Sequence, residues 1–228
     1  MKYDKQDTGS SSKETSRLEA FSDGVFSIAI TLLILELIQI LHEETRGVLL
    51  KNLFQHLNSF IAFLIGFLTI LVCWINHHLV MSYIKKVDST LMWVNGFVLL
   101  VVTFTPFPTA ILAGYFGKES HTALAIFGFN YFMMSLAAYS ITAYAYNKHL
   151  IEKDSREIFY GYKLLYKYSI IYTFLIFLVC FISVFAAIFL CCILFIVFAY
   201  PKEFSLKLLK LKKKKVLNTN KQATSQSS

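Results

Sequence analysis

The chain of 228 residues is 56% hydrophobic and only 16% charged, with a mean hydropathy of +0.57. Soluble domains are more polar, and several apolar runs here are long enough to cross a hydrocarbon core of about 30 Å. The period-two alternation of membrane barrels is absent. We therefore predict an all-α integral membrane protein. The net charge of +8 is concentrated in the C-terminal tail, which favours a membrane surface over nucleic acid as its partner.

The first predicted spanning helix covers residues 21–41. It follows a polar segment, residues 1–16, which we expect to be a disordered N-terminal tail. The helix carries several polar residues, and polar groups at membrane depth are costly unless they face protein or water. We therefore expect this helix to face other helices or a pore rather than lipid alone. Its polar residues are Ser22, Asp23, Ser27, Thr31, Glu36 and Gln39.

Five further spans follow in chain order. The second and fourth cover residues 57–78 and 121–147, and the third covers residues 90–113, where Pro106 and Pro108 should bend or end the helix. Residues 168–200 contain neither a charged residue nor a proline. A single helix of that length would measure roughly 50 Å, so two helices joined by a tight turn near residues 182–187 fit a bilayer better. The sequence thus predicts six transmembrane helices, the last of which ends at Pro201.

The distribution of basic residues predicts the orientation. With six spans, both termini share one side of the membrane, and that side holds all of the 22 Lys and Arg residues except Arg46, Lys51 and Lys118. Because Lys and Arg accumulate on the cytoplasmic side, we expect both termini to be cytoplasmic. We divide the chain into the N-terminal tail, a channel domain over residues 17–201 and a basic C-terminal tail over residues 202–228. That basic tail either lies on anionic membrane lipid or acts as a plain stop-transfer signal.

An apolar stripe runs along the first helix. Ile28, Leu32 and Leu35 are spaced at i, i+4 and i+7 and therefore share a face, which Thr31 borders. In a membrane helix such a stripe serves either helix packing and lipid contact or, when copies surround an axis, hydrophobic constrictions of a pore. The residues alone leave both interpretations open.

The second helix ends in a polar group that includes Trp74, His77 and His78. Adjacent histidines point about 100° apart on a helix, and the i, i+4 spacing of zinc sites is missing, so we expect neither a metal nor another cofactor. We instead predict hydrogen bonds from one or both histidines to Ser22 or Asp23, and Asn95 lies at a depth where it could join them. The sequence also lacks catalytic motifs such as GxSxG and HExxH, so we expect no catalytic residues and no enzyme activity.

Three motifs resemble those of one known family. Arg17-x-x-x-Phe21-Ser22-Asp23 followed by an Ile/Thr/Leu helix resembles the RxxxFSD signature of the transmembrane protein 175 family of potassium channels. Trp74-x-x-His77-His78 also resembles that family's pattern, as does Asn95 followed by Phe104-x-Pro106-Phe107. The resemblance extends from about Arg17 to Thr109. For the last three helices it is architectural only.

The resemblance implies a homotetrameric, potassium-preferring cation channel in the bacterial cell membrane, with the first helix of each subunit lining the pore. Potassium, and other monovalent cations, would cross passively. Ile28 resembles the family's narrowest constriction, Leu32 and Leu35 the next apolar rings, and Thr31 the threonine layer associated with potassium preference. A structural network would hold the first helix in place. Its members would be Arg17, Phe21, Ser22, Asp23, Trp74, His77 and Asn95.

Two rival functions remain open at this point. A proton-permeable channel or proton-coupled transporter could use the cluster of Asp23 and His77, because histidine titrates near neutral pH. A membrane enzyme or assembly factor is less favoured, because the sequence contains no nucleophile–base pair and no metal-ligand constellation.

Overall fold

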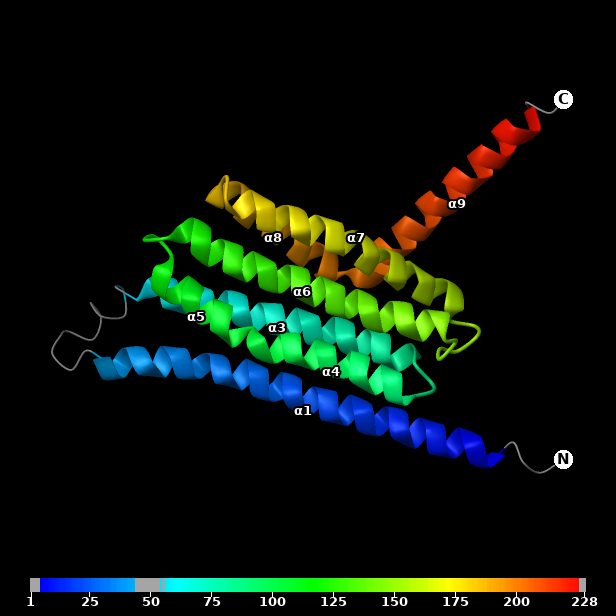
Figure 1. Cartoon of the computed structure of the whole chain (residues 1–228), viewed down its shortest axis with the longest axis horizontal. Coiled ribbons are helices and arrows are strands. Elements are labelled where there is room, and N and C mark those ends of the chain that lie inside the picture. Colours follow the sequence, from blue (N-terminus) through cyan, green and yellow to red (C-terminus); the bar gives the residue numbers. More distant parts are fainter. Residues whose placement is uncertain (1–4, 44–53, 55, 226–228) are drawn as a thin grey trace.

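The computed structural model describes residues 5–43, 54 and 56–225, and the described part of the chain is almost entirely helical. The helices through α8 run side by side in one bundle, whereas α9 projects from it (Figure 1). The predicted all-α class is therefore confirmed. The described helices are α1 (Lys5–Glu43), α3 (Leu57–Tyr83), α4 (Ser89–Phe104), α5 (Pro106–Tyr115), α6 (Ser120–Asn147), α7 (Arg156–Cys180), α8 (Val184–Ala199) and α9 (Pro201–Ser225).

The number of spans depends on how the last pair of helices is counted. Within the described residues, five segments are long and apolar enough to cross a membrane, and α4 with α5 counts as one of them. A sixth is reached when α8 and the start of α9 are taken as one span, although they meet at an angle of 91°. The 16 residues of α8 measure about 24 Å, slightly less than the hydrocarbon core. The six predicted spans thus correspond to the upper count.

Proline and a short turn divide the helices where the sequence suggests. The third span breaks at Thr105, because Pro106 has no backbone N–H to continue the ladder and instead begins α5. The helices α7 and α8 separate at residues 181–183, at the edge of the predicted turn. Ser183 caps α8 there by accepting a hydrogen bond from the backbone N–H of Ala186 at 3.3 Å.

The N-terminal tail differs from expectation in secondary structure, and the basic C-terminal tail, for which we predicted no secondary structure, is largely helical. The helix α1 begins at Lys5, within the segment predicted to be disordered, and α9 continues as a helix through most of the basic tail. Two contacts lie outside the predicted apolar runs. Glu19 meets His78 of α3, and Leu209 of α9 is buried against Gly161 of α7. The proposed domain boundaries themselves stay predictions.

Most basic residues gather at one end of the bundle. The α3–α4 and α6–α7 links pair there, since the backbone N–H of Lys85 donates to the carbonyl of Leu150 at 2.8 Å. The starts of α1 and α9 lie toward the same end (Figure 1). Lys118 lies between α5 and α6 at the opposite end, and Arg46 and Lys51 fall outside the described residues. This arrangement agrees with an even number of crossings.

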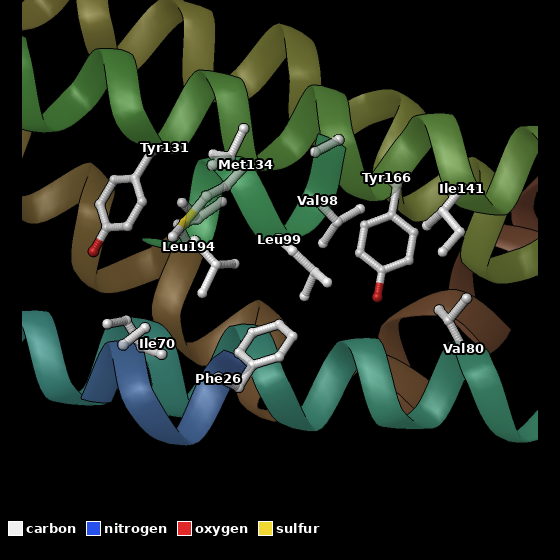
Figure 2. Close-up of a cluster of buried hydrophobic side chains, with 14 of the residues drawn as sticks. Phe26, Ile70, Val80, Val98, Leu99, Tyr131, Met134, Ile141, Tyr166 and Leu194 are labelled. Carbon is white, nitrogen blue, oxygen red and sulfur yellow. The ribbon is translucent and has the colours of Figure 1, made fainter. Parts of the chain in front are cut away.

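The core brings together side chains from α1, α3, α4, α6, α7 and α8 (Figure 2). Lipid tails are as apolar as these side chains, so close packing and polar contacts, rather than the hydrophobic effect, hold such helices together in a bilayer. Phe26 of α1 is almost completely buried at this junction. The labelled members include Phe26, Ile70, Val80, Val98, Leu99, Tyr131, Met134, Ile141, Tyr166 and Leu194.

One close approach between spans occurs at Gly66 of α3. A Cβ atom there would lie 2.8 Å from both side-chain branches of Thr109 and 3.3 Å from Leu33 of α1. Thr109 cannot move easily, because it is buried and its hydroxyl donates to the carbonyl of Thr105 at 2.9 Å. We expect Gly66→Ala to lower the stability of the folded protein by about 1–3 kcal/mol, measured by SDS denaturation in mixed micelles.

The matched control for that substitution is Gly96→Ala on α4. A Cβ atom at Gly96 would have no neighbour within 4 Å, and alanine is the better helix former. This variant should therefore be as stable as the parent chain or slightly more so. Equal losses at both glycines would show that close packing at Gly66 does not contribute.

Candidate functional site

The helix α1 has two faces of different character. Ser22, Phe26, Ala29 and Leu33 recur at i, i+4, i+7 and i+11, and all four are buried against the bundle. This buried face contacts α3, α4 and α5. The rotation of α1 about its own axis is therefore set by the packing of one stripe, and that rotation decides which residues face outward.

The predicted pore residues occupy the outward face. Ile28 is 60% exposed, Leu35 49% and Leu32 42% in the single subunit, and Thr31 is also exposed. The Thr31 hydroxyl donates to the carbonyl of Ile28 at 2.9 Å. The Thr31 proton is used in this hydrogen bond within the helix. The lone pairs of the hydroxyl oxygen therefore stay available on the outward face, where a cation or its hydrating water needs an oxygen acceptor.

A buried chain of hydrogen bonds connects α1, α4 and α3. Asn95 donates through Nδ2 to Ser22 Oγ at 2.9 Å, and its Oδ1 meets His77 Nε2 at 2.8 Å. Ser22 in turn donates to the carbonyl of Leu18 at 2.9 Å. Since Asn95 Oδ1 can only accept, His77 must donate through Nε2. All three side chains are at least 95% buried, so water does not reach them. These hydrogen bonds therefore satisfy polar groups that would otherwise lack a partner.

A second pair of contacts ties α1 to α3 next to this chain. Trp74 donates from Nε1 to Asp23 Oδ1 at 2.8 Å, and His78 Nδ1 meets Glu19 Oε1 at 3.0 Å. The sequence predicts that a histidine could reach Ser22 or Asp23. In the structure the indole of Trp74 bonds to Asp23, and His77 reaches Ser22 only through Asn95. Glu19 was not predicted as a partner, because it precedes the apolar run.

Two predicted network members lie apart from these contacts. Phe21 is 63% exposed and Arg17 is also exposed, on the outer side of α1. Among the residues that the structure describes, Arg17 forms no hydrogen bond or ion pair. The predicted role of Arg17 and Phe21 in the network that holds the first helix in place therefore stays a prediction.

Sequence reasoning also missed a second polar group farther inside the bundle. Asn76 donates to the carbonyls of Val72 and Phe198, both at 2.8 Å, and accepts from the hydroxyl of Tyr166 at 3.0 Å. It thereby connects α3 to α7 and α8. The signal was present, since Asn76 stands between Trp74 and His77, but nothing in the sequence identifies its distant partners.

Beside this group lies a cavity of about 90 Å³ between α3, α4, α6, α7 and α8. Asn76, His77 and Tyr166 contribute to its wall, which is otherwise mainly apolar. The cavity is separate from the outward face of α1. Across the described residues, no group of three or more His, Cys, Asp or Glu side chains is placed to hold a metal ion.

Comparison with known proteins places this geometry in a family. A family model described as endosomal/lysosomal potassium channel TMEM175 matches residues 17–106, which comprise the apolar part of α1 through α4. A crystal structure described as a lysosomal potassium-selective channel TMEM175 homologue from Chamaesiphon minutus superimposes with a TM-score of 0.71 and 32% identity. The superposition covers 83% of this chain and 98% of that one. The chain belongs to the TMEM175 family.

Two curated bacterial relatives, both named potassium channels, match part of the chain. The relative from Chamaesiphon minutus is 51% identical over 104 residues, which are 45% of this chain and 51% of the relative. The one from Streptomyces collinus is 45% identical over 126 residues, or 54% of this chain and 61% of the relative. The chain thus matches about half to three-fifths of the length of these TMEM175 relatives. Family membership makes it a multi-pass membrane protein.

Proposed function

We propose that this protein is a potassium-preferring cation channel that conducts passively through a pore lined by α1 from several copies. The observation that carries the proposal is the outward face of α1, where Ile28, Leu32 and Leu35 are exposed beside the hydroxyl of Thr31. The names of the bacterial relatives and of the superimposed channel support the same function.

The outward face of α1 differs from the other exposed faces of the bundle. Gly24, Ser27 and Thr31 interrupt its apolar residues. On α7 and α8, by contrast, the large exposed residues are mostly hydrophobic, as expected for contact with lipid. A mixed face of this kind suits contact with water and with its own copies better than contact with acyl chains alone. Those large exposed side chains include Phe174, Leu175, Leu178, Phe185, Phe189 and Ile196.

In an assembly with closed rotational symmetry, the outward faces of α1 meet around the axis and line a pore. When identical helices surround an axis, each exposed stripe is covered by its own copies, and a ring of apolar side chains is formed at each level. A ring of isoleucines can exclude water and so block ions, and a small widening lets it fill with water. We propose four copies, because the family resemblance implies a homotetramer.

The preference for potassium follows from hydration. Apolar rings offer no oxygen ligands to replace the water around an ion, so an ion that passes them must give up part of its shell. Potassium holds its water less tightly than sodium and therefore crosses at lower cost. The Thr31 oxygen next to the Ile28 ring is placed to compensate part of that loss.

We further propose that the protein lies in the bacterial plasma membrane with the starts of α1 and α9 on the cytoplasmic side. The support is the concentration of Lys and Arg at that end of the bundle, which is typical of cytoplasmic loops.

The decisive experiment is a selectivity measurement on the purified full chain in planar bilayers. With potassium chloride on one side and sodium chloride on the other, we expect a reversal potential displaced toward the potassium equilibrium potential. A protein that passes no potassium current at any voltage or pH would contradict the proposal. A current that survives replacement of potassium by an impermeant cation and follows the pH gradient would favour the alternative, a proton pathway through Asp23 and His77.

A further inference from the structure

Three cationic side chains from α7 and α9 converge on two neighbouring tyrosine rings at the Lys-rich end of the bundle. The rings of Tyr146 on α6 and Tyr160 on α7 have centroids 5.4 Å apart. Arg156 Cζ lies 4.8 Å and Lys163 Nζ 4.6 Å from the centroid of the Tyr146 ring, and Lys212 Nζ lies 4.6 Å from that of Tyr160. We call Arg156, Lys163 and Lys212 the basic cluster.

Among the described residues, none of the hydrogen-bond partners of the basic cluster is a carboxylate. Lys163 donates to Asn147 Oδ1 at 2.8 Å, while Arg156 contacts His149 Nδ1 and Lys212 contacts the Tyr160 hydroxyl. In the described part of the chain, the ion pairs are those of His78 with Glu19 and Lys213 with Glu157, so no member of the cluster has an ion pair of its own. Glu157, which adjoins Arg156 in the sequence, pairs with Lys213 instead.

The two cations on α7 are also partly withdrawn from water. Arg156 and Lys163 are half-buried, whereas most other lysines at this end are exposed. Like charges gathered around two adjacent rings repel one another, and partial burial reduces the screening by solvent. Cation–π contacts offset part of this cost but leave the charge uncompensated. An anion bound among the three would remove the repulsion.

The place of the cluster in the fold indicates where such an anion comes from. Arg156 is the first residue of α7, a candidate membrane span, so the cluster lies where the span meets the headgroup layer. The chain turns by 91° between α8 and α9, which directs α9 away from the direction of the spans. The stripe Lys207, Lys210 and Lys214 on α9 is exposed, as expected for a helix next to an anionic surface.

We propose that the basic cluster binds the phosphate of an anionic phospholipid headgroup between α6, α7 and α9. The Arg156 guanidinium offers paired donors that match phosphate oxygens, and the two lysines add point charges. A free anion lacks the acyl chains that the neighbouring span would contact, so the position favours a lipid. Because α9 contributes Lys212, headgroup binding also favours the docked position of α9 on α7.

The docking of α9 depends on the absence of a side chain at Gly161. A Cβ atom there would lie 2.9 Å from Leu209 Cδ1 and 3.1 Å from the carbonyl of Ser205, both on α9. Leu209 and Ser205 are buried at this contact. The same close approach therefore brings Lys212 to Tyr160 and completes the basic cluster.

The test measures binding of dioctanoyl phosphatidylglycerol to the full chain in dodecyl maltoside by microscale thermophoresis. Dioctanoyl phosphatidylcholine and inorganic phosphate are the comparison ligands. We expect phosphatidylglycerol to bind the most tightly. The triple substitution Arg156→Gln, Lys163→Gln and Lys212→Gln should weaken its binding about tenfold or more, because each basic residue near an anionic lipid contributes to attraction.

Two further triple variants distinguish lipid binding at the basic cluster from general electrostatic attraction to the positively charged chain. Lys202→Gln, Lys207→Gln and Lys210→Gln remove the same charge from the exposed side of α9, and this variant should retain affinity within about threefold. The charge-retaining triple Arg156→Lys, Lys163→Arg and Lys212→Arg should bind nearly as well as the parent, which also controls for folding. An equal loss of affinity for phosphatidylglycerol in all three triple variants would overturn the proposal. So would equal affinities for the two lipids, or inorganic phosphate binding as tightly as phosphatidylglycerol.

Discussion

Ile28→Asn is expected to increase potassium efflux from loaded liposomes about tenfold or more, which corresponds to lowering the barrier by about 1.4 kcal/mol. Ile28 is the most exposed of the three apolar residues on the outward face of α1. If copies of α1 surround an axis, the substitution changes every member of one ring at once. Amide groups hydrogen-bond water, so the ring should fill with water under conditions where the isoleucine ring excludes it.

The same substitution should also reduce the preference for potassium over sodium. A ring that holds water no longer forces an ion to shed part of its hydration shell, and the difference between the two ions becomes smaller. Measurements of efflux with each cation, on the same protein preparation, give both the rate and the ratio. A faster rate with an unchanged ratio would indicate that Ile28 gates the pore without contributing to selectivity.

Ile171→Asn on α7 is the matched control. Ile171 is 65% exposed, close to the value of Ile28, and it also lies within a spanning helix. The chemical change is therefore the same, but at Ile171 the amide faces lipid instead of the proposed pore. Flux should remain near the parent value. If both variants leaked equally, disturbance of the membrane rather than a pore along α1 would explain the effect, and the proposed pore would be wrong.

The spans could be predicted from the sequence because their signals are local. Long apolar runs identify α1, α3, α6 and α7, and the ring of Pro106 interrupts the third span at the predicted place. The helical form of α9 was not predicted. A run of lysines signals a polar tail in sequence, and only the contact of Leu209 with Gly161 shows that part of this helix is docked.

The polar partners could be predicted only in part. Ser22, His77 and Asn95 lie at similar depths on different spans, so a shared network was a reasonable prediction, and the structure places them in hydrogen-bond contact. Depth does not determine which neighbour each side chain meets. That choice depends on the rotation of each helix, which separates the adjacent His77 and His78 by about 100° and sends them to Asn95 and Glu19.

Asn95→Leu should lower the stability of the folded protein by about 2–4 kcal/mol. The variant removes the hydrogen bonds of Asn95 to Ser22 and His77, both between buried side chains. Interhelical hydrogen bonds in membranes contribute about 0.6 kcal/mol each on average, but the buried His77 Nε2–H is also left without an acceptor, which costs about 1–3 kcal/mol more. SDS denaturation in mixed micelles, followed by circular dichroism, measures the change.

Asn58→Leu provides the comparison on α3. Asn58 is exposed and donates to the carbonyl of Phe116 over a longer distance, 3.4 Å, so its loss should change stability by less than about 0.5 kcal/mol. A double-mutant cycle with His77→Leu then tests the mechanism. Once Asn95 is absent, removing His77 should cost less than it does in the parent chain, because no unsatisfied imidazole remains.

The network also links stability to conduction. Ser22 lies on the buried face of α1, one to two turns before Ile28 on the outward face, so the hydrogen bonds of Asn95 help to set the rotation that presents Ile28, Thr31 and Leu35 outward. Asn95→Leu should therefore alter potassium flux in liposomes as well as stability, whereas Gly66→Ala, which affects packing at another level, should change mainly stability. Additive energies in the double-mutant cycle, with unchanged flux, would show that the network merely fills the core and does not position the pore helix.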